Sequence, residues 1–405
     1  MDGKKTNPWG NKHWRQLKYA AKCLPTYAWQ RLTRHRQDGP VHLILALADH
    51  FEPSTIPGHD MGYAPPEVQE QRLETWCKEY PRNFAHFRDS DGRQFTHTYF
   101  YPAEQYDYAH LDRLAQLCHG GWGEIEIHLH HGIARPATAE ETRKQLVEFR
   151  DTLSERHGCL AYEESSKDPK YVFVHGNFAL ANATGGRGCG VDNEIEVLAE
   201  TGCYADMTYP ASVFHPAQVA KLNSIYECAL PPRRRAPHRR GRDLEVGRPV
   251  KKFPFLLQGP WMFDSDRSSR SGLGRIENGA LTRGSPPSLR RLELWKKAAI
   301  SVQGRPDWVF IKLHTHGMDP NDTATILGEP MQHFLRELIN RAPERGEVLH
   351  FVSAREMVNI ALAACDGRQG NPGEFRDYRY NRSCTEAHGR VLTPINGAQS
   401  PLPKG

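Results

Sequence analysis

Several features that would define a class of protein are missing from this 405-residue sequence. It has no run of 18 apolar residues, so nothing in it predicts a membrane-spanning helix. Its nine cysteines form no CxxC pair, and scattered, odd-numbered thiols are typical of a reducing compartment. The first residues lack the apolar core of a signal peptide. We therefore expect a cytoplasmic protein whose cysteines are free.

The common catalytic signatures are also missing. The sequence contains no GxSxG, no P-loop, no HExxH and no GxGxxG after a strand. A net charge of +5 is small for a dedicated nucleic-acid binder, so we expect no nucleic-acid partner. Hydrophobic residues make up 38% of the chain, enough for a large core. Histidine stands out with 21 residues, and because it is the commonest metal ligand, the composition favours a metal site.

From residue 41 onward, short apolar strands alternate with amphipathic helices. Strands are expected at 41–48, 96–101, 124–131, 171–175, 204–210, 307–314 and 348–352. Helices are expected at 67–89 with a break near Pro81, at 107–119, 138–157, 194–201 and 331–341, and from 354. Thr138 and Glu141 form a capping-box pattern. This alternation predicts an α/β protein with a parallel sheet, and the number of units predicts a distorted (β/α)7-type barrel.

The two ends of the chain differ from the centre. Residues 1–40 interleave aromatic and basic residues and predict a basic amphipathic N-terminal extension. It either packs on the barrel or makes peripheral contact with an anionic membrane. The barrel is expected over 41–365, with an excursion at about 229–290 that begins with an arginine-rich stretch. Residues 366–405, rich in Gly, Pro, Asn and Arg, predict an irregular tail.

Polar residues gather where the predicted strands end, which is where barrels of this class place their active sites. Alternation along the first strand puts Asp49 on the face of Leu45 and Leu47, and His50 on the other face unless the loop turns it. The same rule turns three residues of the third strand into the lumen, with a further histidine after them. The polar residues at strand ends are Asp49, His50, Glu126, His128, His130, His131, His175, Asn177, His314 and His316.

Aspartate and histidine together suit a catalytic Zn²⁺ or similar divalent ion with an open position. Such an ion lowers the pKa of bound water and polarises a carbonyl, so the pattern predicts a metal-dependent hydrolase. We expect the metal ligands among Asp49, His50, His128 and His130. The residues expected to contact substrate are His131, His175, Asn177, Asp206 and His316. The glycine-rich stretch 185–190 is expected to be a mobile loop beside them.

The order of these motifs resembles the polysaccharide deacetylases of carbohydrate esterase family 4, within the glycoside hydrolase/deacetylase barrel superfamily. The similarity spans roughly residues 41–360. The corresponding segments are Leu47-Ala48-Asp49-His50 at the family's Asp-Asp pair, Glu124-Ile125-Glu126-Ile127-His128 at its second motif, Val174-His175-Gly176-Asn177-Phe178 at its third and Leu313-His314 at its last. Gly132 stands where the second motif's later histidine would fall, so His130 or His131 must substitute. The arginine of the third motif is absent.

The resemblance implies a metal-dependent deacetylase that removes the acyl group of an N-acyl (or O-acyl) sugar or glycan precursor, which for the N-acyl substrate is hydrolysis of a C–N bond other than a peptide bond. It implies Asp49 as metal ligand or base, His128 as ligand and His314 as general acid. Zinc is the expected cofactor, with Co, Ni or Mn as alternatives, and the expected partner is a carbohydrate or a sugar-linked small molecule.

Two other functions are open on the sequence. One is a glycoside hydrolase on a related barrel, which needs two carboxylates roughly 5–10 Å apart. Asp49 with either Glu52 or Asp206 would supply them. The other is a catalytically degenerate barrel that binds glycans or scaffolds an assembly, because the first and third motifs depart from the family pattern.

Overall fold

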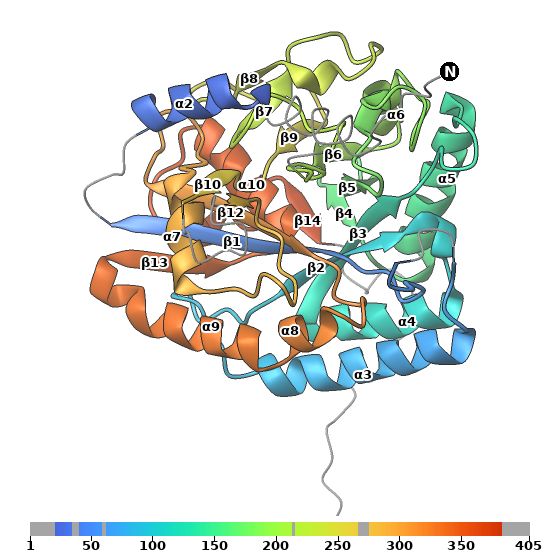
Figure 1. Ribbon diagram of the computed structural model, residues 1–405, viewed down its shortest axis with the longest axis horizontal. Coiled ribbons are helices and arrows are strands. Elements are labelled where there is room, and N and C mark those ends of the chain that lie inside the picture. Colours follow the sequence, from blue (N-terminus) through green and yellow to red (C-terminus); the bar gives the residue numbers. More distant parts are fainter. Residues whose placement is uncertain (1–20, 35–39, 59–61, 213–214, 266–274, 383–405) are drawn as a thin grey trace, which may run out of the picture.

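The structure is a computed structural model that describes residues 21–34, 40–58, 62–212, 215–265 and 275–382. It is a mixed α/β protein built on a large, mostly parallel sheet (Figure 1). The parallel strands are β1 (Val41–His50), β2 (His97–Pro102), β3 (Gly123–Leu129), β5 (Pro169–His175), β6 (Cys203–Asp206), β9 (Phe255–Leu257), β12 (Trp308–Thr315) and β13 (Glu347–Phe351). The hydrogen-bonded order is β12-β1-β2-β3-β5-β6-β9-β7-β8, with β13 also on β1. Closure into a (β/α)7-type barrel stays a prediction.

The remaining strands are antiparallel. They are β4 (Ala161–Glu163), β7 (Ile225–Cys228), β8 (Gly241–Asp243), β10 (Met262–Asp264), β11 (Arg275–Glu277) and β14 (Tyr380–Arg382). β10 and β11 form a separate two-stranded sheet. The stretch 229–290, expected as an excursion, therefore also supplies β8 and β9 to the large sheet.

Helices cover the sheet, and Figure 1 shows α3, α4, α8 and α9 along one side of it and α2 at the opposite margin. The helices are α2 (Leu24–Thr33), α3 (Pro66–Phe84), α4 (Tyr108–Leu117), α5 (Ala139–Asp151), α6 (Glu194–Glu200), α7 (Leu289–Lys297), α8 (Thr323–Leu327), α9 (Glu329–Arg341) and α10 (Ala354–Cys365). The short helical turns are η1 (Ala103–Gln105), η2 (Cys118–Trp122), η3 (Thr152–Arg156), η4 (Leu180–Asn182), η5 (Pro237–Arg239), η6 (Pro343–Arg345) and η7 (Pro372–Phe375). The predicted break at Pro81 is wrong, because α3 continues through it. Pro81 lies in the last turn, where a missing N–H costs the helix at most one bond.

Strand β1 divides the hydrophobic core into two parts. Leu43, Leu45 and Leu47 point to one face and belong to the cluster that includes the buried side chains of α3, α4 and α9. The alternate residues, Ile44 and Ala46, point to the other face and pack in a cluster with α10. Because side chains alternate along a strand, each residue at the end of β1 is committed to one of these two environments.

The carboxyl ends of the central strands lie side by side. In the parallel register, Ala48 of β1 pairs with His314 of β12, and His128 of β3 pairs with Val174 of β5. Pro102 at the end of β2 pairs with His128. The polar residues that follow these strands are therefore brought to one edge of the sheet.

Helix α2 is the described part of the N-terminal extension. It packs on the body of the protein: Gln30 donates a hydrogen bond to the carbonyl of Leu222, and Arg34 donates to the carbonyl of Asn223. Trp29 and Leu32 on this helix are exposed. None of the described helices combines the length and the apolar character that crossing a bilayer requires. Peripheral membrane contact stays a prediction, and residues 1–20 lie outside the described part of the chain.

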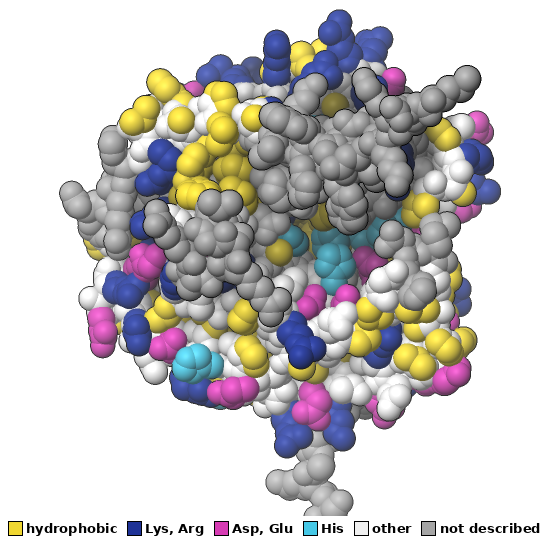
Figure 2. Space-filling view, in the orientation of Figure 1, with side chains coloured by type: hydrophobic (Ala, Val, Ile, Leu, Met, Phe, Trp, Pro, Cys, Tyr) yellow, Lys and Arg dark blue, Asp and Glu magenta, His cyan; other side chains and the backbone are white. Residues whose placement is uncertain are grey.

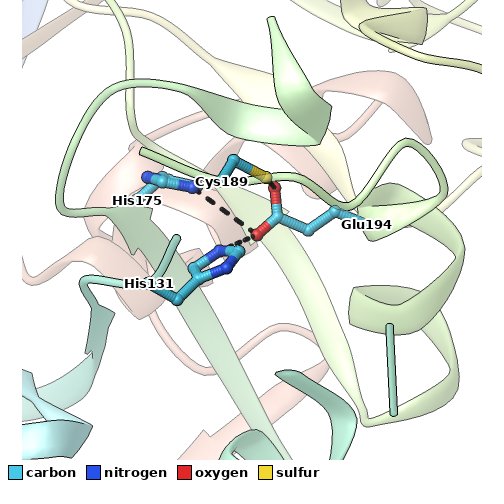
Figure 3. Close-up of side chains that lie close together, drawn as sticks. All are labelled: His131, His175, Cys189 and Glu194. Atoms are coloured by element: carbon cyan, nitrogen blue, oxygen red, sulfur yellow. Dashed lines mark hydrogen bonds and ion pairs between the residues drawn. The ribbon is translucent and has the colours of Figure 1, made fainter. Parts of the chain in front are cut away.

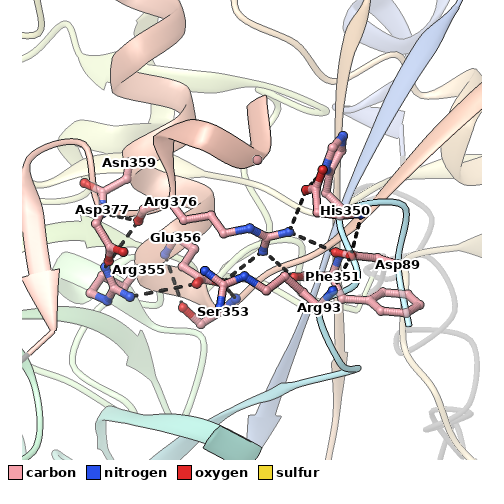
Figure 4. A network of polar contacts seen from close by, with 12 residues as sticks. Asp89, Arg93, His350, Phe351, Ser353, Arg355, Glu356, Asn359, Arg376 and Asp377 are labelled. Atoms are coloured by element: carbon pink, nitrogen blue, oxygen red, sulfur yellow. Dashed lines mark hydrogen bonds and ion pairs between the residues drawn. The ribbon is translucent and has the colours of Figure 1, made fainter. Parts of the chain in front are cut away.

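The segment after α10 is held against the sheet as far as residue 382, although an irregular tail was expected from 366. The buried guanidinium of Arg376 lies 2.8 Å from the carboxylate of Asp89 and 3.2 Å from that of Asp91 (Figure 4). Arg355 on α10 pairs with Asp377 at 2.6 Å. The low apolar content of this segment misleads, because buried ion pairs add to the packing of Phe375, Tyr378 and Tyr380 against the core. Residues 383–405 lie outside the described residues.

Candidate metal centre

Five side chains at the edge formed by β1, β3 and β12 make up what we call the Glu52 centre: His50, Glu52, His128, His130 and His316. Two groups of three donors share Glu52, one with His50 and His316, the other with His128 and His130. Within each group the donor atoms lie within 4.8 Å of one another. Figure 2 shows histidine and acidic side chains together in a hollow near the middle of this face.

Two of the histidines are oriented from behind through their Nδ1 atoms. Nδ1 of His128 donates to the carbonyl of Val174 at 2.9 Å, and Nδ1 of His130 donates to the carboxylate of Glu104 at 2.7 Å. Their Nε2 atoms face the same carboxylate oxygen, Oε1 of Glu52, at 3.2 and 3.8 Å. A second-sphere acceptor that fixes the ring and the tautomer is the usual arrangement for metal-binding histidine.

The contact between His128 and Glu52 calls for a proton or a metal ion between the two facing atoms. Nδ1 of His128 carries the proton of the hydrogen bond to the Val174 carbonyl, so in the neutral ring Nε2 has no proton. Its lone pair then faces the Glu52 oxygen, and two acceptors face each other. A second proton on His128 would relieve this, but burial lowers the pKa of that ring. Burial alone would raise the pKa of Glu52, yet the contact with His128 and the charge of His130 lower it to about 2. The donor set therefore fits a bound cation.

The charge on His130 points the same way. Burial by itself would lower the pKa of this ring, but the hydrogen bond to Glu104 and the carboxylate of Glu52 raise it to about 9. The side chains of Glu52 and Glu104 are 14% and 19% exposed, so both act on the ring with little screening by water. The two carboxylates around His130 therefore stabilise a positive charge, whether it is a proton on the ring or a bound metal ion.

His50 and His316 form the other side of the centre. The ring of His50 lies 4.6 Å from that of His128 and 4.7 Å from that of His316, between centroids. Burial, and then the neighbouring histidines, hold the pKa of His50 well below its usual value, so this ring is neutral. A neutral imidazole is the form that binds metal.

Asp49 lies outside the groups of metal donors found among the described residues. It points to the face of β1 that carries Leu45 and Leu47, where its Oδ1 accepts the backbone N–H of Gly317 at 2.7 Å. Its Oδ2 has no hydrogen-bond partner in the described structure, and Nε2 of His97 lies 3.9 Å away. Burial raises the pKa of Asp49 to about 7. Its predicted roles as ligand and base remain untested.

His314 and Asp206 are buried but lie outside the groups of metal donors found among the described residues. The His314 ring is 6.4 Å from that of His50, and its buried Nδ1 has no partner among the described residues. Asp206 accepts from the hydroxyl of Thr208 at 2.8 Å, and burial raises its pKa to about 7. Lys312 donates to the carbonyl of Met207 at 2.7 Å. The predicted roles of His314 and Asp206 also remain untested.

The structure does not place all of the predicted substrate residues together. His316 is in the Glu52 centre, but His131 and His175 belong to a separate buried group that contains Glu194. Asn177 lies beside that group, and its backbone N–H donates to Nδ1 of His175. The substrate roles predicted for His131, His175 and Asn177 are not tested by this arrangement.

Sequence reasoning missed Glu104 and considered Glu52 only as a glycosidase carboxylate. Glu52 follows the end of β1 by two residues, and Glu104 lies in η1, directly after β2. Both are acidic residues just past a predicted strand, and that is the signal that would have found them.

No protein-family model and no curated protein matches the chain. Among solved structures, a chain from Mycobacterium smegmatis that is provisionally described as a polysaccharide deacetylase is similar to this one, with a TM-score of 0.42 and 15% sequence identity. The similarity covers 82% of this chain and 92% of that one.

Proposed function

We propose that this protein is a metal-dependent hydrolase that removes an acyl group from the nitrogen (or oxygen) of a sugar or sugar-like substrate, on a distorted (β/α)7-type barrel. The observation that carries the metal is the pair His128 and His130, both anchored through Nδ1 and both aimed through Nε2 at Glu52. The choice of an acylated sugar rests on the order of the sequence motifs, which resembles that of polysaccharide deacetylases.

The proposed ligands are Glu52, His128 and His130. Two imidazoles and one carboxylate are a ligand set of catalytic zinc sites that keep a position open, so we propose Zn²⁺, with Co, Ni or Mn as alternatives. This assignment gives Glu52 the ligand role that sequence reasoning placed on Asp49. Asp49 becomes a positioning residue, because its hydrogen bond to the Gly317 amide fixes the turn that carries His316.

A divalent ion in this site would lower the pKa of bound water and polarise the acyl carbonyl. The hydrolysis also needs side chains that transfer protons to and from the substrate. His314 offers a buried Nδ1 without a partner, and we assign it the proton that the leaving nitrogen requires. His316, at the open side of the centre, orients the substrate next to His50. Histidine is the side chain that most often transfers protons in such reactions, and burial holds the pKa of His314 well below its usual value, so a proton on this ring is given up readily.

The test is metal analysis by mass spectrometry on purified protein. We expect bound divalent metal in the wild type and a clear loss in the double variant His128→Ala/His130→Ala. His333→Ala is the matched control, because this histidine is exposed on α9. Release of acetate from N-acetylated amino sugars is then measured on the same samples.

Acetate release by the wild type that is lost in the double variant, but kept in the control, would support the proposal. A folded wild type that takes up no Zn²⁺, Co²⁺, Ni²⁺ or Mn²⁺ would refute it. That result would favour a carboxylate-based glycosidase or a glycan-binding protein.

A further inference from the structure

A second group of donors lies behind the Glu52 centre and plays no part in the proposed hydrolysis. Its members are His131, His175, Cys189 and Glu194, all buried, with donor atoms within 4.8 Å of one another (Figure 3). They come from four separate segments: the residues after β3, the end of β5, the glycine-rich stretch and the first residue of α6. Histidine, cysteine and carboxylate together are zinc ligands.

We propose that these four side chains bind a second divalent metal ion, Zn²⁺ by the nature of the donors, which fastens the glycine-rich segment to the sheet. The ligand atoms are Nε2 of His131, Nε2 of His175, Sγ of Cys189 and a carboxylate oxygen of Glu194. With four protein ligands the site is closed, which is the pattern of structural rather than catalytic zinc.

Neighbouring groups orient three of the donors. The sulfur of Cys189 accepts backbone N–H groups from Asn182 at 3.3 Å and Val191 at 3.4 Å. Amides directed at sulfur stabilise the thiolate, which is the form that binds metal. Oε2 of Glu194 accepts the N–H of Ala181 at 2.6 Å, which leaves Oε1 toward the histidines.

His131 is oriented in the same way. Its Nδ1 lies 3.5 Å from the hydroxyl of Thr142, and its Nε2 lies 2.6 Å from Oε1 of Glu194. If Nδ1 carries the ring proton and donates it in a hydrogen bond to the Thr142 hydroxyl, the lone pair of Nε2 points toward the other three donors. The hydroxyl of Thr142 thus acts as the second-sphere partner that metal-binding histidines usually have.

His175 supplies an independent sign of a missing ligand. Its side chain is fully buried, and its Nε2 has no hydrogen-bond partner although it points at Oε1 of Glu194 from 3.6 Å. An unsatisfied polar atom in the interior is costly, and a metal ion would satisfy it. Coordination through Nε2 places the remaining ring proton on Nδ1, so the present contact with the Asn177 amide has to open when the metal binds.

The charges of the group balance around a divalent ion. One thiolate and one carboxylate cancel a 2+ charge, and the two imidazoles are neutral ligands. Without an ion, the buried carboxylate of Glu194 relies on hydrogen bonds and on protons held by its neighbours. A neutral metal complex removes this requirement, and buried charge is stable only when it is paired or bound to metal.

The site would explain why an irregular segment is fixed so closely to the sheet. The backbone of Cys189 lies so near Gly132 that a Cβ there would meet its carbonyl oxygen at 1.9 Å. The Cys189 carbonyl accepts the N–H of Ala137, and the Gly132 carbonyl accepts that of Gly188, each at 2.8 Å. A metal bound to Cys189 would secure the segment that was expected to be mobile.

The test uses Co²⁺ as the probe, because a cobalt–thiolate bond gives a near-ultraviolet charge-transfer band that nitrogen and oxygen ligands do not. Full-length protein is stripped with a chelator and titrated with Co²⁺. We expect the band to saturate at about one equivalent of thiolate-bound cobalt per chain. We expect it to be lost in Cys189→Ala and kept in Cys228→Ala, a control at another buried free cysteine.

The double variant Glu52→Gln/His128→Ala separates this site from the hydrolytic one. It should keep the charge-transfer band whether or not the Glu52 centre binds metal, and it should lose a second equivalent of metal only if that centre binds one. Binding of Co²⁺ to the wild type without a charge-transfer band, or a band that survives in Cys189→Ala, would overturn the proposal. If Cys189→Ala does not fold, loss of the band in His131→Ala supports the proposal and a band that survives there overturns it.

Discussion

Replacing Glu104 by glutamine tests whether the orientation of His130 serves a metal. The carboxylate of Glu104 accepts two hydrogen bonds from His130: Oε1 from the ring Nδ1 at 2.7 Å and Oε2 from the backbone N–H at 3.2 Å. A glutamine side chain has the same size but only one acceptor oxygen, so its NH₂ group must face one of these two donors. Glu104→Gln therefore removes one hydrogen bond and the negative charge behind the ring, and leaves the packing unchanged.

The expected cost follows from those two losses. A hydrogen bond to a charged group contributes about 1.5–3 kcal/mol, and loss of a second-sphere partner typically weakens metal binding by about 10- to 100-fold. We expect the dissociation constant for Zn²⁺ to rise by about 10- to 100-fold, which corresponds to about 1.4–2.8 kcal/mol. The assay is competition with a chromophoric chelator, with Glu70→Gln as the control at an exposed carboxylate. A change of about twofold or less, in a variant that melts like the wild type, would refute the reasoning because it would fall below the smallest effect expected.

Three further predictions concern the stability of the folded protein. Burial raises the pKa of Asp49 to about 7, so its contribution to stability is present at low pH and is lost as the pH rises through 7. In denaturant titrations, the unfolding free energy of Asp49→Asn should therefore fall less between pH 5 and pH 8 than that of the wild type. An equal fall in both proteins would contradict this. A Cβ on Gly317 would lie 2.3 Å from the Asp49 carboxylate, so Gly317→Ala should cost about 1–3 kcal/mol by denaturant titration. Gly284→Ala, whose Cβ would meet only the Thr282 hydroxyl at 3.9 Å, an ordinary van der Waals contact, should be neutral. Arg376→Ala leaves Asp89 buried and unpaired and should cost about 3–5 kcal/mol, a loss that a well-tolerated variant would rule out.

Much of the secondary structure is predictable because its signals are local. The apolar run of β1, the alternation in β3 and the capping box of Thr138 and Glu141 at α5 each depend on a few adjacent residues, and the structure confirms them. What lies far away in sequence is not predictable in this manner. The ordered course of residues 366–382 includes the ion pair of Arg376 with Asp89, a partner 287 positions earlier.

The histidines that the sequence places at strand ends do gather at one edge of the sheet, but sequence reasoning did not include Glu52 among the metal donors beside them. Alternation correctly separated Asp49 from His50, yet the same rule that placed Ile125 and Ile127 under the helices places Asp49 there too, with Leu45 and Leu47. Glu52 reaches the histidines only because the chain turns after β1. The alternation of side chains applies within a strand, so it does not predict where a side chain in the following loop points.

Gly132 stands at a position where the structure leaves no room for a side chain. A histidine at this position cannot be accommodated, because the backbone of Cys189 occupies the space that a side chain would need. The histidines beside it divide between the two sites instead: His130 faces Glu52, and His131 faces Glu194. Gly176 makes the first of these possible, since a Cβ there would strike the His130 ring at 2.2 Å. Two consecutive side chains at the end of one strand thus connect the proposed hydrolytic ion to the proposed structural ion. Because they share one short backbone segment, any shift of that strand end caused by loss of metal at Cys189 must move His130 as well.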